Sequence, residues 1–163
     1  MKKFFAAILA MSLVLLLAAC GGKGGEGTGT KSVDLNQYYE DYMAALGEDN
    51  APAMMDVEGE VLDSLYPGLS GYKTTQAVFK TAAISAVAYE FALVELEKAS
   101  DAEQVATIFQ ERINSQVGGG AFYPQTIADW ENAKVAVHGN VVALIVAGGD
   151  QDRAVEAFEN LFA

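Results

Sequence analysis

The sequence VAVHGNVVALIVA at residues 135–147 gives the clearest indication of the fold. A Gly-Asn pair between two valine-rich runs is typical of a tight turn between antiparallel strands. The second run, residues 141–147, is apolar, which predicts a strand buried at the centre of a sheet. We therefore expect a β-hairpin that turns at Gly139 and Asn140 and places its second arm in the core.

Two more strands are expected upstream of the hairpin. Residues 88–96 alternate between two sets of side chains, as a strand does. Residues 77–83 are ambiguous, because their alanines suit a helix whereas Val78, Phe79 and Thr81 suit a strand. We interpret this second stretch as a strand as well.

Apolar residues at helical spacing predict the remaining elements. One helix follows a cap at Ser32 or Asp34, and another opens at Ser100 with the spacing of a capping box. The glycines at 118–120 end this second helix and are expected to form a flexible connector. The predicted helices lie at residues 35–46, 58–66, 100–117 and 124–131, and from 148–150 to the end of the chain.

This order of elements predicts one α+β domain at residues 34–163. We expect a small two-layer domain. In it, a mostly antiparallel sheet of about four strands carries its helices on one face.

Residues 1–19 have the three parts of a secretory signal peptide. Two lysines precede an apolar run at 4–17, which is shorter than the roughly 20 residues of a membrane-spanning helix. The small residues Ala18 and Ala19 then precede Cys20. This ending resembles the lipobox of bacterial lipoproteins. The resemblance implies cleavage between Ala19 and Cys20, a diacylglyceryl thioether on Cys20, and acylation of the new amine with a fatty acid such as palmitate. A plain secreted protein, or an uncleaved helix with an incidental cysteine, is the alternative.

The segment that follows Cys20 reads GGKGGEGTGTKS and contains no apolar residue. Such a glycine-rich chain is a flexible tether with a span of about 20 Å. Residues 20–33 are thus expected to hold the domain, through the lipid alone, at the outer, extracytoplasmic face of a bacterial cell membrane.

The chain carries 22 acidic and 10 basic residues, for a formal charge of −12. Loss of Lys2 and Lys3 with the leader would make the domain more acidic still. This charge repels phosphate backbones, so nucleic-acid binding is not expected. It repels anionic lipid headgroups for the same reason. Solubility explains the charge, and a preference for cationic ligands is the more specific alternative.

The sequence predicts no catalytic residue, metal ligand or cofactor. His138 is the only histidine and precedes a tight turn, whereas Cys20 is the only cysteine. No phosphate-binding, dinucleotide-binding or nucleophile-elbow motif occurs. Two carboxylates of a glycosidase remain an alternative, but the many acids do not indicate which ones.

Four motifs in the second half carry a family resemblance. They are Glu-Arg-Ile-Asn-Ser-Gln at 111–116, Tyr123-Pro124, Asn-Ala-Lys-Val at 132–135 and Gly139-Asn140. From about Asp34 to Ala163, the chain resembles a family of Firmicutes lipoproteins whose domain has no known function. Similar proteins usually carry tyrosine at the position of Val141, and the alanine-rich stretch 81–88 is also atypical. The resemblance implies no activity.

Arg112 is the single arginine of the helix at 100–117, and Glu90 is an acid at the start of the strand at 88–96. They are expected either to form a structural ion pair or to leave Arg112 lining a ligand groove, since buried arginine is rare unless paired. The sequence as a whole favours a membrane-anchored, non-catalytic module that binds an unknown protein or small molecule. A cell-envelope hydrolase that uses carboxylates is the alternative.

Overall fold

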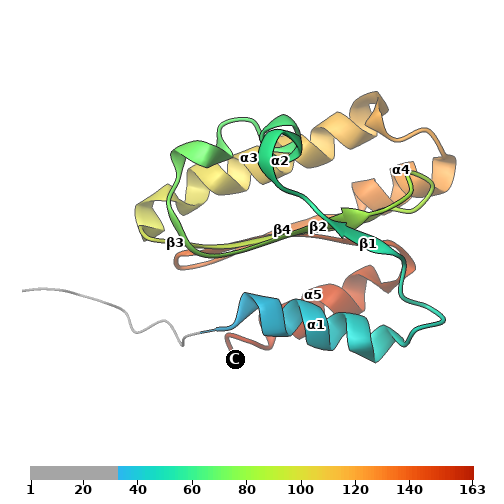
Figure 1. Cartoon of the computed structure of the whole chain (residues 1–163), viewed down its shortest axis with the longest axis horizontal. Helices are drawn as coiled ribbons and strands as arrows, with labels where there is room; N and C mark the ends of the chain where they lie inside the picture. Colours follow the sequence, from blue (N-terminus) through green and yellow to red (C-terminus); the bar gives the residue numbers. More distant parts are fainter. Residues whose placement is uncertain (1–32) are drawn as a thin grey trace, which may run out of the picture. The chain divides into compact units, whose positions relative to one another are not determined.

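A five-stranded antiparallel sheet lies at the centre of the computed structural model, which describes residues 33–163 (Figure 1). The strand order across the sheet is β1-β2-β3-β5-β4. The strands are β1 (Met54–Asp56), β2 (Thr74–Ala82), β3 (Tyr89–Leu96), β4 (Lys134–His138) and β5 (Val141–Ala147). The expected hairpin is confirmed as β4 and β5, and it turns at Gly139 in a left-handed conformation with φ 62°.

The strand β1 is an element that the sequence did not predict. It has three residues and pairs with the end of β2, where Met54 lies opposite Ala82. A segment this short has too few residues to show an alternating pattern. Its strand conformation comes from its pairing with β2.

The expected helices are present. They are α1 (Leu35–Leu46), α2 (Gly59–Leu65), α3 (Ala102–Ser115), α4 (Pro124–Glu131) and α5 (Gln151–Glu159). Of these, α1 and α4 have the expected bounds, whereas α2, α3 and α5 are shorter than expected. Asp34 caps α1, since its Oδ1 accepts a hydrogen bond of 2.9 Å from the backbone N–H of Gln37. The capping box of α3 does not form, because Ser100 Oγ donates to the side chain of Asp101 instead. A wide helical turn, Gln116–Gly120, follows α3 and is kinked at Gly119, whose φ of 131° is not helical.

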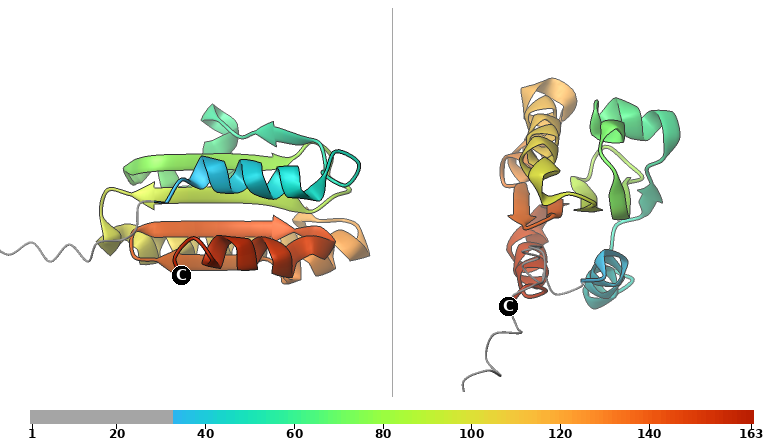
Figure 2. Two further views of the ribbon diagram at one scale, coloured as in Figure 1. Left: turned by 90° about the horizontal axis from the view of Figure 1, so that it is seen from below. Right: turned by 90° about the vertical axis from the view of Figure 1, so that its left-hand side faces the viewer.

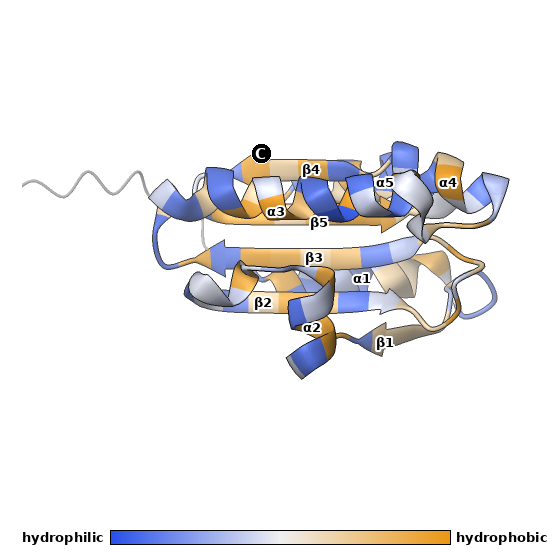
Figure 3. Ribbon diagram, turned by 90° about the horizontal axis from the view of Figure 1, so that it is seen from above, coloured by the Kyte–Doolittle hydropathy of each residue, from blue (hydrophilic) through white to orange (hydrophobic). Residues whose placement is uncertain are grey.

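Helices cover both faces of the sheet, so the expectation of two layers with helices on one face was wrong (Figures 1 and 2). Helices α1 and α5 pack on one face, and α2, α3 and α4 pack on the other. The α+β class and the antiparallel sheet are confirmed, with five strands where about four were expected. The central strands require this cover, because the apolar residues of β3 and β5 are divided between the clusters on the two faces. Both strands are hydrophobic along most of their length (Figure 3).

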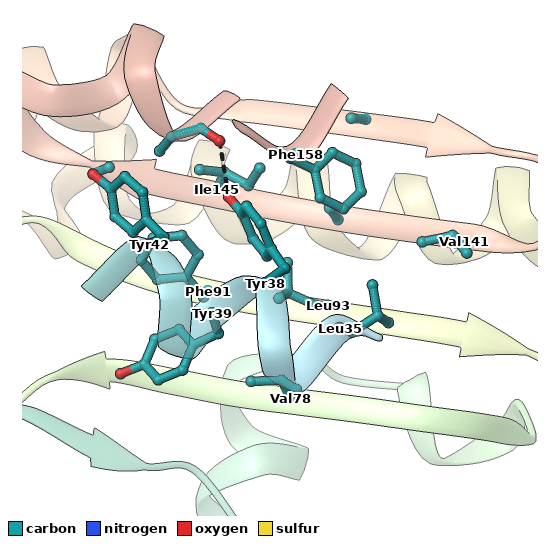
Figure 4. Packing of buried hydrophobic residues seen from close by; sticks show 14 of the residues in the cluster. Leu35, Tyr38, Tyr39, Tyr42, Val78, Phe91, Leu93, Val141, Ile145 and Phe158 are labelled. Carbon is teal, nitrogen blue, oxygen red and sulfur yellow. Dashed lines mark hydrogen bonds between the residues drawn. The ribbon is translucent and has the colours of Figure 1, made fainter. Parts of the chain in front are cut away.

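The face under α1 and α5 is packed with aromatic rings, and we call it the aromatic face (Figure 4). Tyr38, Tyr39 and Tyr42 of α1 surround Phe91 of β3, with ring centroids 5.5–6.4 Å from it. These distances are typical of favourable aromatic contacts. The three tyrosines are therefore part of the core.

On the opposite face, α3 packs Val105 and Phe109 against Val142 and Leu144 of β5. No helix within residues 33–163 is long and apolar enough to cross a lipid bilayer. The predicted signal peptide, Ala19, Cys20 and most of the predicted tether lie outside the described residues. Val33, which the sequence placed in the tether, is buried in the aromatic face.

Candidate functional site

The candidate site is centred on Glu90, near the start of β3. Its neighbours Tyr89 and Phe91 point into the aromatic face, so the alternation along the strand directs Glu90 to the face under α3. The side chain is 1% exposed. A buried carboxylate is costly unless donors surround it, so its partners determine what it can do.

Arg112 of α3 meets this carboxylate with two parallel hydrogen bonds. Its Nε donates to Oε1 at 2.8 Å and its Nη2 donates to Oε2 at 2.7 Å. The Arg112 side chain is 11% exposed. The structure thus brings Glu90 and Arg112 together in the bidentate geometry that gives the strongest arginine–carboxylate pairs.

Two hydroxyl groups complete the shell around Glu90. The phenol of Tyr66, just after α2, donates to Oε1 at 2.6 Å, and Thr81 Oγ1 of β2 donates to Oε2 at 3.2 Å. An ionised carboxylate has about four lone-pair positions, so these donors together with Arg112 occupy all of them. We call the side with Tyr66, Glu90, Arg112 and Trp130 the ion-pair face.

The ion pair changes the protonation behaviour of its partners. Burial raises the pKa of Tyr66 well above 10.0, and the charge of Glu90 and the hydrogen bond to it raise it further. Burial by itself would lower the pKa of Arg112. Its hydrogen bonds and attraction to Glu90 outweigh that effect, so the pKa of Arg112 is raised above its ordinary value. Both groups therefore keep their protons at neutral pH.

Arg112 keeps one nitrogen available for other contacts. The hydrogen bonds to Glu90 use Nε and Nη2. Within the described residues, the third nitrogen, Nη1, makes no hydrogen bond to another side chain or to the backbone. The guanidinium lies over the ring of Trp130 on α4, 5.1 Å from its centroid. This distance is typical of a cation–π contact.

A cavity of about 190 Å³ opens beside this pair, and we call it the Arg112 pocket. Its walls come from the loop between β2 and β3 and from the turn after α3. It is lined by Thr81, Ala82, Ile84, Ser85, Val87, Tyr89, Glu90, Arg112, Gln116, Gly120, Ala121 and Trp130. A Cβ added to Gly120 would lie 2.6 Å from Nε2 of Gln116, so glycine leaves room for that side chain.

Arg112 also lines a second cavity, a groove of about 320 Å³ between α2 and α3. Leu65 and Ile108 form part of its walls. Helix α2 buries none of its residues fully, so it covers this side of α3 loosely. The guanidinium therefore lies between a polar pocket and a more apolar groove.

The other charged side chains considered from sequence lie elsewhere. His138 is at the opposite end of the sheet, where its Nε2 lies 2.8 Å from Glu159 Oε2 and its ring stacks on Phe162. In the described part of the chain, no three His, Cys, Asp or Glu side chains are grouped so that they could hold a metal ion. The Arg112 pocket is the cavity that adjoins the buried ion pair, and we take it as the candidate site.

Sequence reasoning missed Tyr66, Thr81 and Trp130 as members of this site. Tyr66 lies 24 residues before Glu90, and Trp130 lies on a separate helix. No local spacing links them, because the sheet register and the helix packing bring them together. The available signal was Trp130, the single tryptophan of the chain.

A family model described as Domain of unknown function (DUF4358) matches residues 47–147. The chain belongs to this family. A search of curated proteins and a search of solved structures found no match. The matched span of the DUF4358 domain contains the whole sheet and every residue of the Arg112 pocket, whereas α1 and α5 lie outside it. The site is therefore part of the family's domain.

Proposed function

We propose that this protein is a membrane-anchored, extracytoplasmic lipoprotein whose DUF4358 domain binds a ligand in the Arg112 pocket without converting it. One observation carries the binding role: Glu90 has no acceptor position left, while Nη1 of Arg112 keeps its donors. The pocket therefore offers hydrogen-bond donors on a rigid frame.

Catalysis is less well supported, because a general base needs a free lone pair within reach of the substrate. Glu90 is the one carboxylate among the residues that line the pocket. It would have to give up a donor before it accepted a proton. A glycosidase needs a second carboxylate on the other side of the scissile bond, and the lining residues do not supply one.

The pair also limits the class of ligand. Glu90 neutralises Arg112 at close range, and the chain as a whole is acidic, with a net charge of −12. An anionic ligand would gain little from such a site. An uncharged ligand that presents a carbonyl oxygen to Nη1 fits it better.

The binding role can be tested by fluorescence, because Trp130 is the only tryptophan and touches the guanidinium. N-acetylleucine amide and N-acetylglucosamine would serve as uncharged probes, and acetate as an anionic one. We expect a saturable change in emission with an uncharged probe. Arg112→Lys should abolish it, because lysine keeps the charge beside Glu90 but lacks Nη1.

Arg153→Lys is the matched control, since Arg153 is exposed and donates to the carbonyl of Ala45. It should leave the response to the probe unchanged. The proposal fails if no probe alters the emission, if Arg112→Lys responds like the unchanged chain, or if a probe is hydrolysed.

The anchor rests on the sequence pattern that ends at Cys20. Two or three acyl chains on this residue would hold the protein stably, because one chain gives only marginal binding. Cells given labelled palmitate should label the protein and keep it in the membrane fraction. Cys20→Ser should release it unlabelled, and a Cys20→Ser protein that still carries label would refute the anchor.

A further inference from the structure

Two uncharged segments form the walls of the Arg112 pocket. Residues 81–89 and 115–123 contain no acidic or basic residue, although the chain has 32 of them in all. Both segments lie at the end of the sheet where β2 ends and β3 begins. We call these two segments the uncharged tip.

Large apolar side chains are exposed on this tip. Ile84 lines the pocket and is 62% exposed. Phe122 follows the lining residue Ala121 and is 80% exposed, and Tyr123 is 54% exposed. Exposed aromatic residues without charged neighbours are typical of the centre of a protein interface.

Acidic residues surround the tip. Asp150 accepts a hydrogen bond from Tyr89, a residue of the pocket wall, and Asp129 is close enough to raise the pKa of that tyrosine. Glu48 and Asp49 precede β1, which begins at the same end of the sheet. The cations near this end are the exposed Lys134 and Arg153 and the partly buried Lys80, which is paired with Asp56. The surroundings of the tip are therefore predominantly negative.

We propose that the uncharged tip binds a segment of a partner protein in which an apolar or aromatic side chain is flanked by basic residues. This proposal rests on the proposed function and identifies its ligand. The apolar side chain packs on Ile84 and Phe122, a backbone carbonyl accepts from Nη1 of Arg112, and the basic flanks face the acidic surroundings.

Other occupants fit these observations less well. A second copy of the chain would bring two strongly acidic domains together, and an anionic bilayer would repel the same charge. The acyl chains of a lipid offer no acceptor for Arg112. An extended polypeptide supplies both the apolar side chain and the carbonyl oxygen.

The position of the tip leaves it accessible. The first described residue, Val33, lies at the other end of the sheet, where its carbonyl accepts from Gln76 near the start of β2. The described chain therefore begins at the end of the sheet away from the tip.

The test is a selection of random peptides displayed on phage, with the purified full chain in detergent as the target. Enriched peptides would then be titrated against the chain, with Trp130 emission as the readout. We expect an apolar or aromatic residue between lysines or arginines, and an affinity that falls as salt is raised. Ile84→Ser with Phe122→Ser should weaken binding by about tenfold or more.

The matched control replaces two exposed apolar residues outside the tip, Val61→Ser with Val137→Ser, and should leave binding unchanged. All four positions are exposed, so both double variants should fold. Enriched peptides without basic residues, or equal binding by the tip variant, would overturn the proposal. So would a dimer in sedimentation that the tip variant loses, or insertion of the tip into vesicles of uncharged lipid.

The two proposals fail in different ways. If N-acetylleucine amide still changes the emission of Trp130 while peptides bind the tip variant and the unchanged chain equally, the pocket binds a ligand but the tip is not its protein interface. If Arg112→Lys has no effect on any probe, the pocket itself is not the site.

Discussion

The two faces of the sheet are built from the same strands but stabilised in different ways. On the aromatic face, rings from α1 and α5 fill the space over Phe91. On the ion-pair face, the position next to Phe91 in β3 holds a carboxylate with four hydrogen bonds. The family model covers Glu90 and its partners on the ion-pair face, but it does not cover α1 and α5 of the aromatic face. One face thus serves packing, and the other combines packing with a polar site.

The largest expected effect comes from breaking the ion pair. Arg112→Met should lower the free energy of unfolding by about 3–5 kcal/mol, because it leaves a buried carboxylate without its cation. Adding Glu90→Leu should restore most of the loss, since an apolar pair is often as stable as a buried ion pair. Urea unfolding of the two single variants and the double variant measures this coupling.

The aromatic face provides the control for this experiment. Phe91→Ala should cost a similar amount, about 3–5 kcal/mol, by leaving a cavity. When Phe91→Ala is combined with Arg112→Met, the two losses in free energy of unfolding should add, and neither should be restored. If the losses in free energy of unfolding for Glu90→Leu and Arg112→Met simply add in the double variant, the two side chains are not coupled. That result would contradict the assignment of the two faces.

The next effect concerns the phenol that closes the shell around Glu90. Tyr66→Phe should cost about 1.5–3 kcal/mol, the range for a hydrogen bond to a charged group. The ring itself is kept, so its contacts with Phe79 and Phe109 are unchanged. Thermal unfolding followed by circular dichroism would measure the loss, and a cost below that of Tyr38→Phe would show that the shell around Glu90 is not closed.

Both faces should weaken in alkaline solution. Burial raises the pKa of Tyr38 and Tyr42 on the aromatic face and of Tyr66 on the ion-pair face above 10.0. The unfolded chain therefore loses these protons first, so stability is fully present below about pH 10 and falls as the pH rises. The loss should be about 1 kcal/mol per tyrosine between about pH 10 and pH 11.

Denaturation at a series of pH values measures this slope. Each Tyr→Phe variant should reduce the slope of stability against pH by the contribution of the one hydroxyl that it lacks. A slope that none of the three substitutions reduces would assign the alkaline loss to other residues.

The smallest effect separates two tyrosines of the aromatic face. Tyr38 donates to the carbonyl of Ala154 at 2.9 Å, whereas the buried hydroxyl of Tyr42 has no partner within the described residues. Tyr38→Phe should cost about 1 kcal/mol, and Tyr42→Phe should be neutral or slightly stabilising. Equal costs for the two, measured by urea unfolding, would show that the hydroxyl of Tyr42 is bonded in solution.

Local signals in the sequence predicted most of the elements. The Gly139-Asn140 turn, the apolar run of β5 and the cap at Asp34 each depend on residues close together in the chain. The same run also indicates how the strand is covered. A strand with apolar residues at every position needs cover on both faces, which contradicts a two-layer domain.

Residue types alone were enough to indicate an acidic α+β domain, a buried hairpin arm, and a lone glutamate and arginine that each need a partner. Three other features emerged only in the folded chain: the strand β1, the division of the helices between two faces, and the joining of Tyr66 and Trp130 to the ion pair. Short-range preferences act between neighbours in sequence, whereas these features depend on sheet register and helix packing. Register and packing bring together side chains that no spacing in the chain relates.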